Sequence, residues 1–132
     1  MVRFGGYLIE DGRRRVQLPV LVDSEWVEIG KVLPRFQGST GVATIRIDTA
    51  PEVGPYNLTL YAECGNYLLM LSEYASDGEH EVRSPHNPSA SGLMIMLGDA
   101  YPASAVIRDF DLVKTCFFQF YSAGTVSSEL LT

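Results

Sequence analysis

Few side chains in this sequence are suited to nucleophilic or acid–base chemistry. The two histidines, His80 and His86, lie in a polar region rich in turn residues. The two cysteines, Cys64 and Cys116, lie in apolar segments, where a thiol is expected to be buried, reduced and unreactive. Nucleophilic catalysis needs a nucleophile, a base within its reach and a group that orients the base. No G-x-S-x-G motif or comparable arrangement brings these groups together.

The motifs that hold nucleotides and metals are also missing. There is no Walker glycine loop, and no G-x-G-x-x-G lies between a strand and a helix. Zinc would need further Cys or His residues at ligand spacing. Glu63, Glu73 and Asp99 are capable of acid–base work, but isolated acids of this kind are typical of solvated surfaces. We therefore predict that the protein is not an enzyme and that it uses no metal or cofactor.

The charge of the chain limits its partners. The formal net charge is −6 over 132 residues, whereas nucleic acids and anionic membranes are bound through basic residues. No apolar run reaches the roughly 18 residues of a spanning helix, and acidic and basic residues stand where a signal peptide needs its apolar stretch. We expect a cytoplasmic protein that binds neither nucleic acid nor membrane. Its acidity suits a basic protein partner, or simply solubility.

Two amphipathic segments are predicted to form helices. The first begins at Asp23 or Ser24, either of which would cap its first turn, and Pro34 stops it. The second has Asp109 as its N-cap and Gly124 in the left-handed C-terminal position. Each helix presents an apolar stripe, made of Trp26, Ile29, Val32 and Leu33 in the first and of Phe110, Leu112, Val113, Cys116, Phe117, Phe120 and Tyr121 in the second.

Most of the remaining chain alternates apolar and polar residues as strands do. Asp11-Gly12 predicts a hairpin near the start, followed by arginines 13–15 on a charged edge strand. Gly65-Asn66 predicts a second hairpin, in which Cys64 faces Tyr67 on the core side. The expected fold is a single α+β domain over residues 1–132, a mostly antiparallel β-sheet with two helices packed on it.

The two ends of the sequence and one hairpin resemble a known family. An aromatic helix, a glycine and a Ser-x-x-Leu tail follow one another at the end of the chain. Their residues are Phe110, Val113, Phe117, Phe120, Gly124, Val126, Ser127 and Leu130. With residues 5–9 and the Gly65–Tyr67 hairpin, this pattern resembles the small bacterial immunity proteins of contact-dependent growth inhibition and related polymorphic toxin systems.

The resemblance implies a function by occlusion. Such immunity proteins bind the C-terminal toxin domain of a cognate effector, often a nuclease, and neutralise it. The expected partner is therefore a toxin domain. Because toxin-contacting residues differ between systems, the resemblance assigns no binding residue.

An acidic turn is the first candidate toxin-binding surface. Asp77, Glu79 and Glu81 place three carboxylates within five residues, and Glu73 comes just before them. Such a surface could occupy the basic cleft of a nuclease as a substrate mimic and speed association. The alternative is a solvated turn.

The second candidate surface lies on the sheet face opposite the predicted core. It carries Tyr61, Met70, Met94 and Met96, and flexible methionines suit adaptable apolar contacts. The alternative is that a helix covers this face and makes it ordinary core.

Two other functions compete with toxin binding. A homodimeric structural protein could use the same tyrosine and methionine face as its interface. A small α+β enzyme with a ligand pocket between helix and sheet would need polar residues on the core face, where the sequence places almost none.

Overall fold

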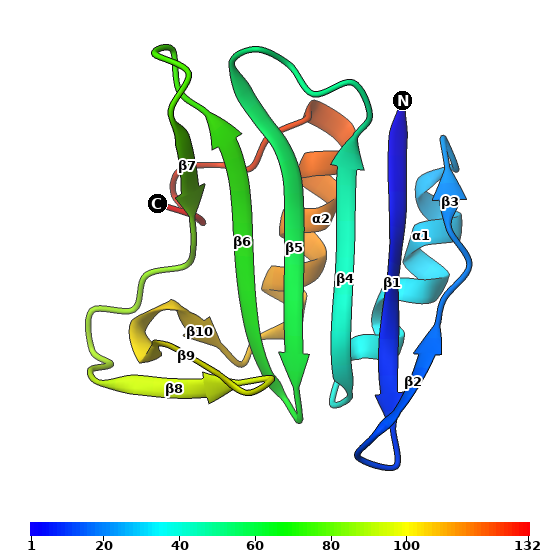
Figure 1. Ribbon diagram of the computed structural model, residues 1–132, viewed down its shortest axis with the longest axis vertical. Helices are drawn as coiled ribbons and strands as arrows, with labels where there is room; N and C mark the ends of the chain where they lie inside the picture. The colour runs from blue at the N-terminus through cyan, green and yellow to red at the C-terminus, as the bar shows by residue number, and fades with distance from the viewer.

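A strongly twisted antiparallel sheet forms the body of the molecule in the computed structural model, which describes residues 1–132 (Figure 1). Its four long central strands are β1 (Val2–Glu10), β4 (Thr40–Ile47), β5 (Gly54–Glu63) and β6 (Asn66–Tyr74). They lie side by side in the order β6-β5-β4-β1. Short strands extend both edges: β2 (Arg14–Gln17) and β3 (Leu21–Val22) pair with β1, and β7 (His80–Arg83) and β10 (Val106–Ile107) pair with β6.

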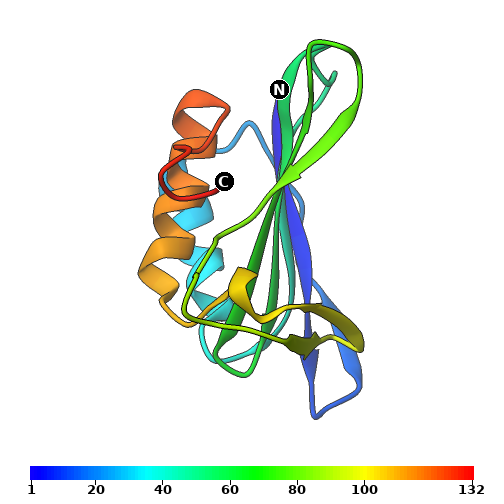
Figure 2. The ribbon, with the colours of Figure 1, turned by 90° about the vertical axis from the view of Figure 1, so that its left-hand side faces the viewer.

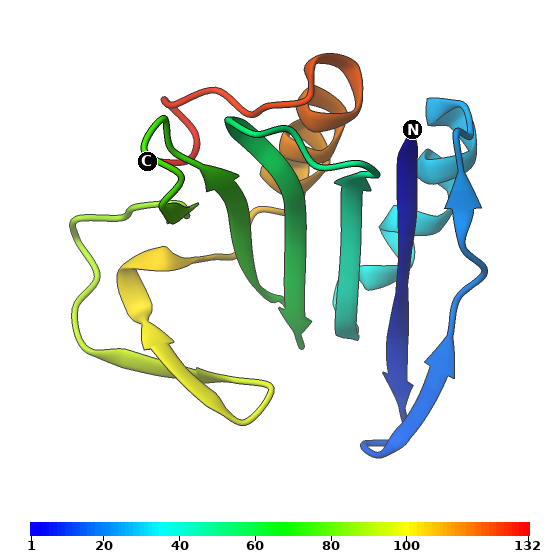
Figure 3. The same ribbon diagram turned by 45° about the horizontal axis from the view of Figure 1, so that its top comes forward.

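A separate hairpin stands at one corner of this sheet (Figure 3). It consists of β8 (Leu93–Met96) and β9 (Asp99–Pro102), which pair only with each other. The segment after this hairpin returns to the main sheet only at its end. Only β10 does so, because residues 103–105 form a turn of 3-10 helix, η2 (Ala103–Ala105).

Both helices pack on the same face of the sheet (Figure 2). They are α1 (Trp26–Val32), which continues into a 3-10 turn, η1 (Leu33–Phe36), and α2 (Phe110–Ala123). The predicted class is confirmed: a single α+β domain with a mostly antiparallel sheet and two helices on it. Neither helix combines the length and the apolar character needed to cross a membrane.

The predicted ends of α2 are both confirmed. The Asp109 carboxylate accepts a hydrogen bond from the Asp111 amide at 2.9 Å and so satisfies one free donor of the first turn. Gly124 adopts φ 72°, the left-handed conformation that suits glycine, and its amide donates to the Phe120 carbonyl at 2.8 Å.

The predicted start of α1 is wrong. Neither Asp23 nor Ser24 caps the helix, because Glu25 precedes it without a side-chain hydrogen bond. The Asp23 carboxylate instead accepts from the Val2 amide at 2.8 Å and fixes the chain beside β1. The α-helix does end before Pro34, at Val32, but the chain then continues as the 3-10 turn η1, in which Pro34 sits near the start, where its missing amide hydrogen is not needed.

The core lies between the helices and the sheet. The inward-facing residues of β1, β4, β5 and β6 alternate with outward-facing ones, as the pleat requires. The predicted stripe of α2 meets them through five buried residues, Phe110, Val113, Cys116, Phe117 and Phe120. From α1 and η1, the buried side chains are Ile29, Leu33 and Phe36.

The β5–β6 turn differs from its prediction by one residue. Its central residues are Cys64 and Gly65, with φ 48° and 90°, and a two-residue turn of type I′ needs positive φ at both. Ala62 rather than Cys64 therefore faces Tyr67. The pairing moves by two residues, so the same strand residues still face the core. Cys64 itself leaves the strand and becomes exposed.

The C-terminal residues strap the β7 edge (Figures 1 and 3). The Ser84 and Thr132 backbones exchange hydrogen bonds of 3.4 and 3.0 Å, and Leu131 is buried in the main core. The Arg83 guanidinium also donates to the Leu131 carbonyl at 3.3 Å. The tail thereby joins the core and the edge of the sheet.

Candidate interaction surface

The face of the sheet opposite the helices is the candidate site, and we call it the open face. No helix packs on it, and the strand pleat brings alternate side chains to it (Figure 2). These are Arg3, Gly5 and Tyr7 from β1, Val42, Thr44 and Arg46 from β4, Asn57, Thr59 and Tyr61 from β5, and Leu68, Met70 and Ser72 from β6. Basic, polar, aromatic and apolar groups are therefore presented together on a rigid surface.

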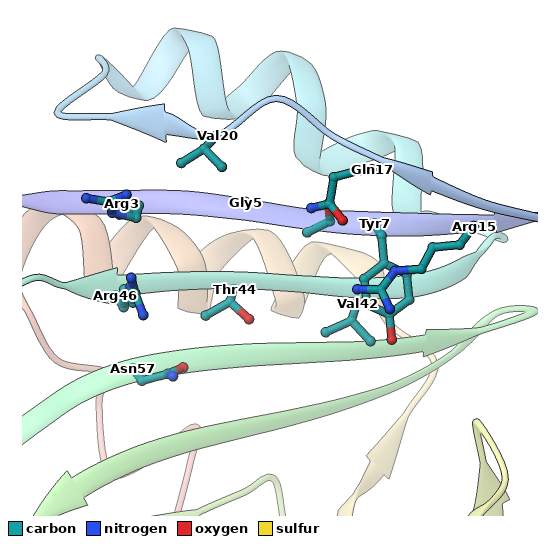
Figure 4. Close-up of a pocket in the computed structure, with 11 residues that line it drawn as sticks. Arg3, Gly5, Tyr7, Arg15, Gln17, Val20, Val42, Thr44, Arg46 and Asn57 are labelled. Atoms are coloured by element: carbon teal, nitrogen blue, oxygen red, sulfur yellow. The ribbon is translucent and has the colours of Figure 1, made fainter.

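One half of the open face holds a shallow depression of about 420 Å³ over β1, β2 and β4 (Figure 4). Three arginines line it, Arg3, Arg15 and Arg46, and no carboxylate does. We call it the basic depression. The sequence analysis missed it because its arginines come from three separate strands and meet only through the strand pairing.

In the other half, the β8–β9 hairpin folds over β5 and β6. It brings together Tyr61, Met70, Met94 and Met96, as the sequence analysis expected of one face. They surround a small second hydrophobic cluster whose buried members are Leu68, Met96 and Val106. Part of this face is therefore covered, but by the β8–β9 hairpin and not by a helix.

This cover corrects the predicted contact set. Met96 is only 1% exposed, because the hairpin packs it against the sheet, and so it cannot contact a partner. Met94, Tyr61 and Met70 are half-buried and remain partly accessible. Three of the four predicted residues therefore remain accessible to a partner, each of them only in part.

The hairpin is fixed to the sheet by a carboxylate. The Leu97 amide donates to Glu63 Oε2 at 2.7 Å, and Leu97 and Gly98 turn the chain with φ 52° and 88°. Beside this contact, the Tyr61 and Tyr101 rings stack at 6.2 Å. Desolvation raises the pKa of the Tyr61 hydroxyl above its ordinary value of 10.0, and Tyr101 raises this pKa further, so Tyr61 stays a neutral hydrogen-bonding group near pH 7.

The outer side of the hairpin is apolar and exposed. Leu93 and Ile95 are 74% and 61% exposed, and they lie opposite Pro102 and Ala100 on β9. Two large aliphatic side chains this exposed are suited to a contact with another molecule.

The acidic turn connects β6 with β7, at the end of β6 remote from the β8–β9 hairpin (Figure 1). Asp77, Glu79 and Glu81 are exposed. The Asp77 carboxylate accepts a hydrogen bond from the Glu79 amide at 2.9 Å, which holds the turn in shape. The structure therefore does not join the two predicted surfaces into one patch.

Glu73 does not belong to the free acidic group. Its Oε1 lies 2.8 Å from Arg83 Nε, and each of the two side chains is only 19% exposed. The Arg83 Nε–H bond does not point at this oxygen, so the contact is an ion pair without a hydrogen bond. Because Arg83 neutralises Glu73, this residue has little charge to offer a partner.

A second aromatic group lies near the acidic turn. The Tyr56 ring stacks on Tyr74 at 4.8 Å, and His80 lies 6.0 and 6.2 Å from these two rings. The register of β5 against β6 shifts between Pro55 and Asn57 and places Tyr56 in this group. Desolvation and the neighbouring Tyr74 raise the pKa of the Tyr56 hydroxyl.

The structure contains no group of three or more His, Cys, Asp or Glu side chains placed to hold a metal ion. Both cysteines are free thiols. The prediction that both are buried is right for Cys116 and wrong for Cys64, which is exposed at the β5–β6 turn. Burial raises the pKa of the Cys116 thiol to about 12, so it remains protonated and inert.

The sequence matches a family of unknown function (DUF6911) over residues 1–130. The chain belongs to this family. The fold is similar to the crystal structure of a hypothetical protein from Neisseria gonorrhoeae, with a TM-score of 0.85 and 30% sequence identity. The similarity covers 96% of this chain and 90% of that one, so it includes nearly every element described above. The comparison with curated proteins gave no match.

The two thiols of this DUF6911 protein are expected to react at very different rates. In the native state, a thiol reagent such as DTNB should modify Cys64 quickly, while Cys116 should react only after unfolding. The Cys64→Ser variant is the control and should show no fast phase. A fast phase in this variant would contradict the burial of Cys116.

Proposed function

We propose that the protein binds another protein through its open face and acts as an immunity protein, as its resemblance to that class suggests. One observation supports this above all: a whole sheet face lacks a helical cover and presents tyrosines, arginines and methionine together. These residue types are enriched in protein interfaces and in their energetic hot spots. The helices on the other face support the sheet from behind, which suits a preorganised binding surface.

The proposed mode of action is occlusion. The protein would bind the C-terminal toxin domain of its cognate effector in the cytoplasm and block the surface that the toxin needs. It would catalyse no reaction itself. On this proposal the chain is not an enzyme and needs no cofactor. Its partner is then a protein rather than nucleic acid or membrane, in keeping with the net charge of −6.

The test is complex formation with the toxin domain of the effector encoded beside this protein. Co-expression should restore growth, and the two proteins should elute together in gel filtration. Tyr7→Ala on the open face should weaken the complex, whereas Phe118→Ala, which removes an exposed aromatic ring on the helical side, should not. No complex at micromolar concentrations would contradict the proposal. A stable dimer without toxin would favour the homodimer alternative, for which Leu93 and Ile95 supply an apolar contact.

The acidic turn is expected to steer association rather than to determine affinity. Replacing Asp77, Glu79 and Glu81 together by serine should slow binding to the toxin and weaken its dependence on salt, because exposed charges act mainly on the association rate. Stopped-flow measurements at low and high salt would check this.

The control for this experiment removes the same charge elsewhere. Glu25, Glu28 and Glu129 are exposed on the helical side, and their triple serine variant should associate as the wild type does. If both triple variants slow binding equally, net charge alone is responsible and the turn has no special role.

A further inference from the structure

Positive charge collects on the open face of this acidic protein. The basic depression is lined by Arg3, Arg15 and Arg46, together with polar groups of Gln17 and Asn57, and by no acidic residue (Figure 4). The chain as a whole carries a net charge of −6. The charge that lines the depression is therefore opposite in sign to that of the molecule.

This positive charge is only partly neutralised within the chain, because the three arginines have one carboxylate partner among them. Asp48 is shared, with its Oδ2 at 2.8 Å from Arg3 Nε and its Oδ1 at 3.3 Å from Arg46 Nε. Arg15 forms no ion pair and lies 3.7 Å above the centre of the Tyr7 ring. One carboxylate thus pairs with two of the three guanidinium groups, and the remaining donors of all three are available to an outside acceptor.

The depression has two charged ends. Arg3 faces Arg46 across the β1–β4 register, and Tyr7, which carries Arg15 above it, lies four residues further along β1. At about 3.3 Å per residue, the two ends are roughly 13 Å apart. A single small anion would reach only one of them, whereas an extended chain would reach both.

The floor between the two ends is open backbone. Gly5 lies there without a side chain, and a Cβ at this position would meet only Val20 Cγ2, at 3.6 Å. Thr44 and Asn57 from the neighbouring strands offer hydrogen-bonding groups along the same floor. A polypeptide could therefore lie close to the sheet between the charged ends.

We propose that the basic depression binds an acidic, extended segment of a partner protein, with one carboxylate at Arg3 and Arg46 and another at Arg15. Guanidinium groups pair well with carboxylates because their donors match the two oxygens. A nucleic acid is disfavoured as the occupant, since its dense charge would be repelled by the acidic remainder of the chain. This inference rests on the proposed function and deepens it, because it names the chemistry of the partner segment that meets the open face.

The experiment uses an octaglutamate peptide as the probe and the 15N-labelled full chain. Titration at low ionic strength should shift the amide signals of Gly5, Thr44 and Arg46 and leave those of α2 unchanged. The Arg15→Gln/Arg46→Gln variant should bind the peptide about tenfold more weakly, a loss of about 1.4 kcal/mol.

Arg14→Gln provides a matched control. It removes an arginine from the same strand, β2, but the pleat directs position 14 to the side opposite Arg15. This variant should bind the peptide as the wild type does. Equal weakening in both variants would mean general charge attraction and would overturn the proposal.

Two further probes distinguish the other occupants. Tighter binding of a thymidine octanucleotide than of the peptide would overturn the proposal in favour of nucleic acid, and equal binding of inorganic phosphate would overturn it in favour of a small anion. No shift with the peptide at millimolar concentration would also overturn it.

The toxin complex is measured separately, so this inference and the proposed function can fail independently. Peptide binding without the toxin complex would contradict only the proposed function. The toxin complex without peptide binding would contradict only this inference.

Discussion

Replacing Gly6 by alanine is expected to destabilise the protein by about 3 kcal/mol or more, a large share of the roughly 5–15 kcal/mol that typically stabilises a folded domain. A Cβ at Gly6 would collide with the carbonyl oxygen of Val42 and lie 2.9 Å from the Ala43 Cα, both on the neighbouring strand β4. Gly6 also has φ 156°, which side-chain-bearing residues rarely adopt. Because the obstacles are backbone atoms, no rotamer change relieves them, and β1 and β4 must move apart. Urea unfolding would measure the loss.

Gly5→Ala is the matched control, because it makes the same chemical change one residue earlier. A Cβ there meets only Val20 Cγ2 at an ordinary contact distance of 3.6 Å. Its effect on the free energy of unfolding should stay below about 1 kcal/mol. Similar losses at both positions would show that the two glycines matter only for chain entropy and not for the close approach of β1 and β4.

Phe117→Ala is expected to cost about 3–5 kcal/mol of the free energy of unfolding. Phe117 is fully buried, and its ring meets the edge of the Phe4 ring at 6.2 Å, so α2 is joined to β1 through this pair. Truncation would leave a cavity between helix and sheet. Urea unfolding should show a lower midpoint with an unchanged slope.

Phe118→Ala should cost at most about 1.5 kcal/mol. Phe118 is 47% exposed, and its main aromatic contact is the Trp26 ring at 5.1 Å. The helical period already places Phe118 on the polar side of α2, next to the core residue Phe117. Equal losses in the two variants would contradict the assignment of the helix face.

The parts of the fold that the sequence predicted well depend on neighbours in the chain. The caps of α2 are local, since Asp109 and Gly124 act on amides and carbonyls within one turn of the helix. The alternation of β5 and β6 likewise survives an error in the turn, because a shift of two residues keeps each side chain on its face.

The failures concern contacts between distant residues. Asp23 is a residue type that often caps helices, but its carboxylate accepts a hydrogen bond from the amide of Val2, which is far from it in the sequence. Glu73 looked like a free acid until β7 brought Arg83 beside it. The candidate site was only partly predictable for the same reason: the methionines were seen, but the hairpin that buries Met96 and the three-strand origin of the basic depression arise only in the folded chain.

The order of synthesis has a consequence for this fold. The sheet strands β1, β4, β5 and β6 are all translated before α2, whose Phe110 and Phe117 cover their inner face. While α2 is still inside the ribosome, this apolar face has no complete cover, and exposed apolar surface of this kind favours aggregation. Docking of α2, together with the backbone hydrogen bonds between Thr132 and Ser84, is thus the step that protects the nascent sheet from aggregation.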